Sequence, residues 1–188
     1  MAEEKERRNV VISAKNLAVD AIKGVGDILQ AAINAVTGTL VTALKGVGEI
    51  TLEATNVIFG KVRGVIQGVA ETGGDLTKAA KGILIGLVRA TKETGTETMG
   101  AIEVTASAVV KSTAEVGGDV VEAAKGAVEG AIQGAKELGL STEEAASAAA
   151  TGAVKAAGEI GAAAGQRVRD GLTGTISGVK VVIREPFK

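Results

Sequence analysis

The residues of this chain best suited to chemistry are its carboxylates, which recur at one fixed spacing. Seven acids stand 22 positions apart, namely Asp27, Glu49, Glu71, Glu93, Glu115, Glu137 and Glu159. Two carboxylates held side by side can act as a general acid and a general base. Here each acid is flanked by basic residues and repeats along one surface, which is typical of a solvated polar face. The spacing therefore favours a structural array over a catalytic pair.

Other chemistry lacks the residue types that it needs. The chain has no His and no Cys, so the usual nucleophile-base pairs and zinc ligand sets are missing. Gly-x-Gly segments such as Gly46-Val47-Gly48 lack the strand-turn-helix context of a phosphate-binding loop. We predict that the protein is not an enzyme and that it binds no cofactor or metal.

The 22-residue spacing also predicts the secondary structure. Eleven residues make three turns of a slightly unwound α-helix, so each acid returns to the same side of a helix. Five residues before each acid stands an apolar residue: Ile22, Leu44, Ile66, Val88, Val110, Ile132 and Val154. Four residues before it stands a base or an amide: Lys23, Lys45, Gln67, Arg89, Lys111, Gln133 and Lys155. These phases predict a broad amphipathic surface with an apolar sector of roughly 130°.

Glycines also recur at regular positions of the repeat, on the polar side of the predicted helix. They form ladders at a spacing of four residues: Gly60, Gly64 and Gly68; Gly82 and Gly86; Gly126, Gly130 and Gly134. Such ladders allow a second helix to approach closely, as small residues do between membrane helices. The alternative is compositional drift in a sequence that is only marginally helical. The sequence leaves both interpretations open.

Composition and period together predict an all-α fold. The only proline is Pro186, and two Phe are the only aromatic residues, so any core consists of small aliphatic side chains. We expect a long amphipathic helix or helical hairpins built from seven to eight 22-residue repeats. One helix cannot cover its own apolar sector, so we also expect a homo-oligomer and no stable compact monomer.

The array is expected to span residues 13–180, between a polar N-terminal tail at 1–12 and a C-terminal tail at 181–188. The strongest stop signal is Gly139 as a helix C-cap, followed by Ser141 as N-cap and Glu144 in a capping box. Gly73-Gly74-Asp75 and Gly117-Gly118-Asp119 carry weaker versions. These signals are either turns into antiparallel hairpins or soft points of a continuous helix. Because the phase continues across them, the pattern favours a rod or a shallow kink, and a straight helix would reach about 250 Å from residue 15 to 184.

Charge and hydropathy indicate which partners and which cellular location to expect. The net charge is −1 and the bases are dispersed, so we expect no nucleic-acid partner. The start, MAEEKERRNVV, has no apolar stretch of a secretory signal, and the longest uncharged run, 28–44, is short and polar for a membrane span. We expect a cytoplasmic protein, free or peripheral to a membrane or granule. The end, VKVVIREPFK, is interpreted either as a peptide that adds to a partner's sheet or as a frayed terminus.

Several segments resemble a known repeat style. RATKETG (89–95), KSTAEVG (111–117) and QGAKELG (133–139) are similar to the Lys-Thr-Lys-Glu-Gly-Val repeats of synucleins. More loosely, residues 15–180 resemble perilipins, exchangeable apolipoproteins, bacterial phasins and late-embryogenesis-abundant proteins. The resemblance implies helices that form on apolar surfaces such as membranes or storage granules. The chain departs from it in lacking the prolines of apolipoproteins and the acidic tail of synucleins.

Two functional hypotheses follow. In the first, amphipathic helices coat or organise a membrane, lipid or other apolar surface, into which their apolar face is buried. In the second, the helices pack on one another through the apolar and glycine faces into a self-assembling bundle, tube or filament, and this scaffold anchors partner proteins. The two hypotheses differ in what covers the apolar face.

Overall fold

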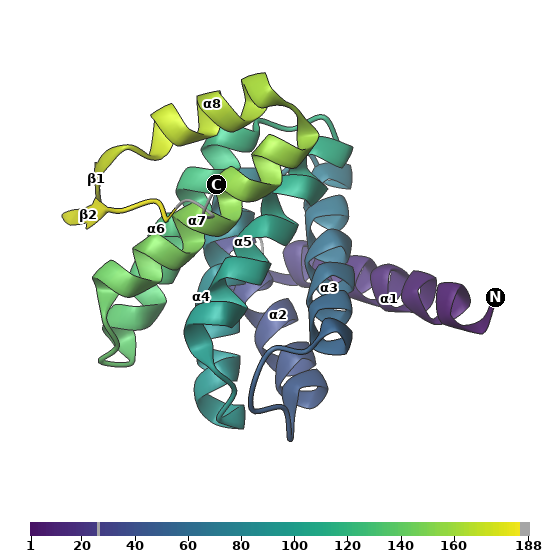
Figure 1. The fold of residues 1–188 in the computed structure, drawn as a ribbon. Helices are drawn as coiled ribbons and strands as arrows, with labels where there is room; N and C mark the ends of the chain where they lie inside the picture. The colour runs from purple at the N-terminus through teal and green to yellow at the C-terminus, as the bar shows by residue number, and fades with distance from the viewer. Residues whose placement is uncertain (26, 185–188) are drawn as a thin grey trace.

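The chain forms a series of helices, of which α2 to α7 have 17 to 20 residues each, followed by a small hairpin (Figure 1). This computed structural model describes residues 1–25 and 27–184, apart from the side chains at positions 21, 22, 24 and 25. Within that part the elements are α1 (Ala2–Val25), α2 (Ile28–Leu44), α3 (Leu52–Glu71), α4 (Leu76–Thr94), α5 (Thr98–Glu115), α6 (Val120–Glu137), α7 (Thr142–Ile160), α8 (Ala162–Leu172), β1 (Gly174–Ile176) and β2 (Val179–Val181). The all-α prediction is confirmed, in its form of helical hairpins.

Each of the helices α3, α4, α5 and α6 is followed, within two residues of its end, by a glycine in the left-handed conformation. Gly73, Gly95, Gly117 and Gly139 have φ angles between 70° and 75°, and they stand 22 residues apart. At three of these turns, those of Gly73, Gly117 and Gly139, the backbone hydrogen bonds form a Schellman motif. Each of the four glycines follows one of the periodic acids by two residues, so the acids mark the ends of helices.

The N-cap residue of the next helix stands two residues after each of these glycines. Asp75, Glu97, Asp119 and Ser141 are the N-cap residues of α4, α5, α6 and α7, and each side chain accepts a hydrogen bond from the backbone N–H of the first turn. Such caps satisfy donors that the helix cannot pair itself. A left-handed glycine and an N-cap two residues later therefore form one turn signal, which recurs through the chain.

The structure corrects the expectation of a rod with its break concentrated at Gly139–Ser141. That break is present, but the described chain also turns back after α1, α2, α3, α4 and α5. The helical phase continues across the later turns because one helix plus one turn occupies 22 residues in the units of α4, α5 and α6. A constant repeat length preserves the phase in a folded array as well as in a straight helix. Helix α1 also starts at Ala2, within the segment expected to be a polar tail.

Helices two places apart in the sequence lie side by side. Helices α1, α3, α5 and α7 form one row and α2, α4 and α6 form a second row, and consecutive helices join the rows. Neighbours within a row are parallel, since contacts advance together along both helices: Lys81 pairs with Glu129, and Arg89 pairs with Glu137 two turns further on. The fold is a two-layer helical repeat.

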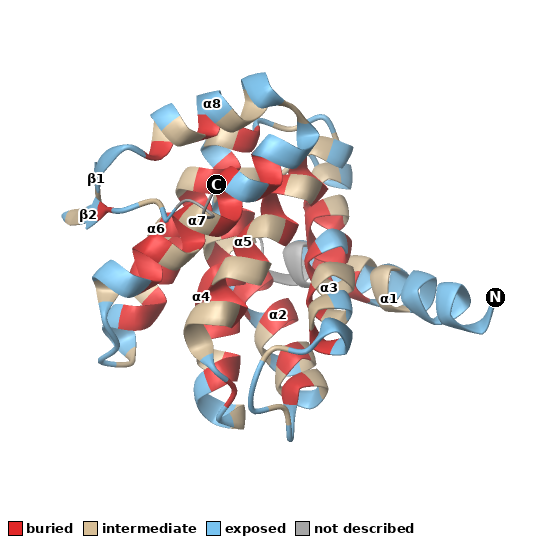
Figure 2. Cartoon of the chain, viewed as in Figure 1, coloured by how far each residue is buried: buried red, intermediate tan, exposed pale blue. Residues whose placement is uncertain are grey.

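The core runs along the interface between the two layers. Every residue of α4 from Gly82 to Val88 is buried, and α5, α6 and α7 are buried along most of their length (Figure 2). Many of the buried side chains are alanine, and the largest are leucine and isoleucine. Neighbouring helices of one chain thus cover the apolar sector that we expected a second chain to cover. Homo-oligomerisation stays a prediction, although this reason for it is removed.

The C-terminal hairpin was not predicted from the sequence. Strands β1 and β2 pair antiparallel with Ile176 opposite Val179. Ser177 and Gly178, with φ angles of 49° and 80°, form the two-residue turn. The sequence interpretation extended the helical phase through Ile176 and Val179, which is wrong here. The missed signal is a Ser-Gly pair between β-branched residues, because two consecutive positive φ angles match the twist of a hairpin.

The turn signal can be tested at Gly117. Alanine at this left-handed position, where an added Cβ meets no other atom, should lower the free energy of unfolding by about 1–2 kcal/mol through backbone strain alone. Gly38→Ala is the matched control, because Gly38 lies inside α2 and is equally open. It should raise stability by up to about 1 kcal/mol. Equal effects in urea unfolding would contradict the turn assignment.

Candidate interaction surfaces of the helical array

The structure places the predicted packing glycines at contacts between neighbouring helices. In α3, Gly60, Gly64 and Gly68 face α1; in α4, Gly82 and Gly86 face α2; in α6, Gly126, Gly130 and Gly134 face α4. At all eight positions an added Cβ would lie less than 3.0 Å from an atom of the facing helix. At Gly64 it would lie 2.5 Å from both the Ala14 Cβ and the Val11 carbonyl oxygen. The ladders are thus intramolecular contact lines.

Two glycines of the same kind were missed by the sequence interpretation: Gly152 and Gly171, where an added Cβ on Gly171 of α8 would lie 2.6 Å from the Val121 Cγ1 of α6. Gly152 of α7 faces the backbone of Glu103 in α5, again with no room for a Cβ. The Ser107 Oγ donates a hydrogen bond of 2.8 Å to the Gly152 carbonyl oxygen across this contact. Gly152 stands alone and not in a ladder, but it follows Gly130 by 22 residues, which was the signal available.

The predicted apolar-face residues lie in the interior. Leu44, Ile66, Val88 and Val110 are fully buried, and Ile132 and Val154 are 5% and 9% exposed. Ile22 lies outside the described side chains. Since these side chains contact other helices of the same chain, the folded array presents none of the first five to an external surface, and of Val154 only the small part that lines a surface pocket.

Four of the periodic acids form ion pairs with bases of a neighbouring helix in the same row, and two of these bases, Arg89 and Lys111, belong to the periodic base positions. The pairs are Lys15 Nζ–Glu71 Oε1 at 3.0 Å, Arg63 Nε–Glu115 Oε2 at 2.7 Å, Arg89 Nη2–Glu137 Oε2 at 2.8 Å and Lys111 Nζ–Glu159 Oε2 at 2.5 Å. In each pair the acid belongs to the helix that follows the base by two. The polar phases therefore join the repeats to one another.

Glu137 is the acid whose titration is most affected by its surroundings. Both the Nε and the Nη2 of Arg89 donate hydrogen bonds to its Oε2, and Gln133 donates to its Oε1. The hydrogen bonds from Arg89 lower the pKa of Glu137, outweighing a partial burial that acts in the opposite direction. The ion pair is therefore favoured at neutral pH.

At the end of the odd row, an extended segment takes the place of a further helix. The Ser147 Oγ of α7 donates a 2.5 Å hydrogen bond to the Val182 carbonyl oxygen, and the Arg184 backbone N–H donates one of 3.0 Å to the Thr151 Oγ1. Glu103 and Ser107 are the α5 residues that contact α7. Ser147 and Thr151 stand 44 residues after them, at the equivalent positions of α7. Residues 182–184 thus bind the chain's own α7. Residues 185–188 of the predicted tail lie outside the described part.

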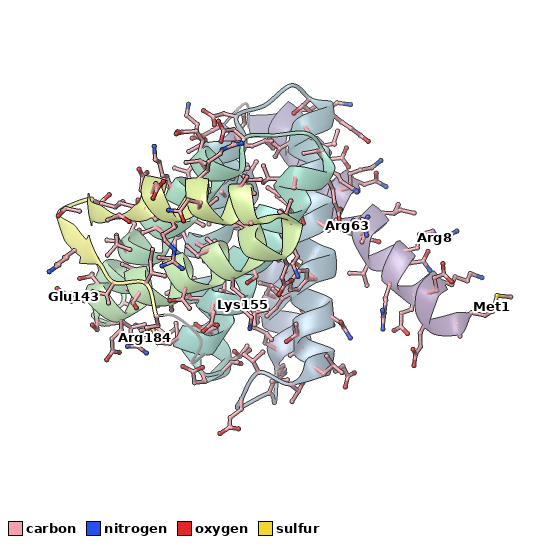
Figure 3. All side chains as sticks on the ribbon, turned by 45° about the horizontal axis from the view of Figure 1, so that its top comes forward. Met1, Arg8, Arg63, Glu143, Lys155 and Arg184 are labelled. Atoms are coloured by element: carbon pink, nitrogen blue, oxygen red, sulfur yellow. The ribbon has the colours of Figure 1, made fainter. Side chains whose placement is uncertain are left out.

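A pocket of about 420 Å³ lies beside this segment, between α7 and α8. Its lining includes Lys155 of α7 and Arg184 of the extended segment (Figure 3). Arg169 of α8 is a third basic residue of the lining. Val154 and Ile183 contribute apolar wall.

At the other end of the array, much of helix α1 is exposed. The N-terminal part of α1 projects away from the body, with Met1 and Arg8 on the free part (Figure 3). On α1, Ile12 and Leu17 are 45% and 44% exposed. Among the described residues, no helix combines the length and apolarity needed to cross a membrane.

Comparison with known proteins identifies no family. No protein-family model and no curated protein matches the chain. Among solved structures, the chain is similar to the crystal structure of the de novo designed helical repeat protein DHR7, at 20% sequence identity and a TM-score of 0.49. The match covers 90% of this chain and 91% of that chain. The resemblance to synuclein-type repeats stays a prediction.

The glycine contacts predict an unusual response to alanine. Gly130→Ala places a methyl group against the Lys81 backbone, which should cost about 1–3 kcal/mol of overpacking and outweigh the gain in helix propensity. Gly158→Ala is the control, because this α7 glycine is helical and has open space at its Cβ. It should stabilise the protein. A Gly130→Ala variant that melts higher than the parent in calorimetry would show that the contact is not tight.

The Arg89–Glu137 pair predicts a pH-dependent effect. Because the folded-state pKa of Glu137 is below the ordinary 4.5, the pair stabilises the fold above that pH and loses its effect as the pH falls through the lowered pKa. Glu137→Gln should therefore lower the free energy of unfolding by about 0.2–1 kcal/mol at neutral pH and by nothing in acid. Glu93→Gln is the control, since Glu93 is exposed and forms no ion pair within the described part of the chain. A pH-independent difference in urea unfolding would contradict the assignment.

Proposed function

We propose that this protein is a non-catalytic structural scaffold, in which one chain forms a rigid helical body and presents its ends and polar surface to partner proteins. The main support for the proposal is where the structure places the periodic apolar residues and the periodic glycines. The apolar residues are buried between helices, and the glycines face neighbouring helices of the same chain. Both faces therefore serve to build the body.

The placement of the carboxylates supports a non-catalytic function. Four of the seven periodic acids form ion pairs between helices, and Asp27 caps α2 by accepting from the backbone N–H of Leu29. A general acid or base needs a carboxyl group that faces a substrate in a cleft. These acids instead face basic residues or helix ends at the protein surface.

The lipid-coating hypothesis requires that the helices of the folded array separate. Val88 and Val110 can enter a lipid surface only if the helices separate, because both side chains are fully buried in the folded array. Separation exposes the core and must be offset by insertion of the apolar faces. The scaffold proposal needs no such transition. Self-assembly also remains a proposal, for which the exposed Ile12 and Leu17 of α1 are the natural contact residues.

Circular dichroism and flotation with vesicles distinguish the two functions. With vesicles of phosphatidylcholine and phosphatidylglycerol, the scaffold proposal predicts an unchanged helical signal, an unchanged melting temperature and no flotation. Val88→Asp should unfold the chain in plain buffer, since a buried unpaired charge costs several kcal/mol. Glu93→Lys, at an exposed position, should leave it folded. A parent chain that becomes more helical and floats with the vesicles would favour surface coating.

A further inference from the structure

The N-terminal turns of α1 project from the body of the protein. Every residue from Met1 to Asn9 is exposed, and the first α1 residue that faces a glycine of α3 is Val10, opposite Gly60. Figure 1 and Figure 3 show this part of the helix pointing away from the other helices. Helical turns that bury no face are marginal in water. The projecting turns therefore gain stability from a surface that packs against them.

The projecting turns carry acids and bases in a fixed order. Glu3 and Glu4 are followed one helical turn later by Arg7 and Arg8. Positions three or four apart lie on one face of a helix, and this face continues through Val11 to the residues that contact α3. The α1 face that packs on α3 thus continues toward the N-terminus as an exposed set of two acids and two bases. We call these four residues the charged face.

The charged face is only weakly engaged within the chain. Arg8 Nη2 lies 3.7 Å from Glu4 Oε1, and the two side chains are 71% and 76% exposed. Such exposed pairs contribute little and leave both groups accessible to a further partner. Glu3 and Arg7 form no ion pair among the described residues.

The order of the charges is complementary to itself when it is reversed. If the α1 of a second copy lies antiparallel, with a two-fold axis midway along the charged face, Glu3 faces Arg8 of the second copy and Glu4 faces its Arg7. The symmetry makes both contacts twice. A parallel arrangement sets acids against acids and bases against bases, which is repulsive. The charges therefore favour one orientation of one partner, a second copy of the chain.

We propose that the projecting turns of α1 are a self-association site, at which two copies of the chain pair antiparallel through the charged face. The inference rests on the proposed scaffold function and names a second copy as one partner of the scaffold. The contact closes a dimer and does not extend into a filament, because both copies use the same patch. It also differs from a contact through Ile12 and Leu17, which stand about 110° from the centre of the charged face on the helix.

Sedimentation velocity over a range of concentrations tests the proposal. The full-length chain should form a dimer and no larger assembly, and raising the salt from about 50 mM to about 500 mM should weaken it. Glu3→Arg/Glu4→Arg makes the face wholly basic, and Arg7→Glu/Arg8→Glu makes it wholly acidic. Each variant alone should lose affinity by about tenfold or more, because like charges then face each other. An equimolar mixture of the two should dimerise again, since every facing pair is then opposite in charge.

Two further variants locate the contact. Lys78→Glu/Lys136→Glu makes the same change in net charge as the acidic variant, at exposed residues of α4 and α6, and should dimerise like the parent. Ile12→Ser/Leu17→Ser removes exposed apolar side chains of α1 and should also leave the dimer intact. Circular dichroism establishes that every variant is folded.

Three outcomes would overturn the inference. They are a parent chain that stays monomeric at every concentration, an equal loss in the acidic variant and its lysine control, or a mixture of the basic and acidic variants that does not dimerise. A chain that stays monomeric but melts cooperatively and ignores vesicles contradicts this inference alone. A chain that unfolds onto vesicles contradicts the scaffold function itself.

Discussion

The close approach of neighbouring helices in each row is the contact on which the rest of the structure depends. Gly64 and Gly130 lie against backbone atoms of the preceding helix in their row, where a single methyl group would not fit. Such contact lets small side chains fill the space between helices at the density of a protein interior. A chain with almost no aromatic residues can therefore bury a continuous core, because the distance between its helices is short enough for alanine and valine to span.

This contact also constrains the polar surface. Once two helices of a row lie close together and parallel, a base on the first and an acid on the second are brought within ion-pair distance at the same level. Arg89 with Glu137 and Lys111 with Glu159 are examples. Each pair contributes little stability at the surface, but together they favour the register that the glycines permit.

Much of the fold could be predicted from the sequence, because helix class, period and the glycine phases are local patterns. The break at Gly139 and Ser141 carried a complete cap signal and is present. The choice between rod and hairpins could not be made from phase, since a constant unit length gives the same phase in both. The burial of Val88 against other helices could not be predicted either, because an apolar helix face has the same sequence whether it contacts lipid or another helix. The pocket lies where α8 and the extended segment meet α7, and no periodic pattern reveals that arrangement.

The most direct test of the stacked array is the distance between equivalent positions two repeats apart. The chain has no native cysteine, so spin labels can be placed at Lys78 and Glu122, which are exposed, 44 residues apart and on the neighbouring helices α4 and α6. The account predicts strong dipolar broadening in the EPR spectrum, because packed helix axes lie about 8–10 Å apart. A spectrum without broadening, and a distance near the roughly 66 Å that 44 residues span in a continuous helix, would contradict it.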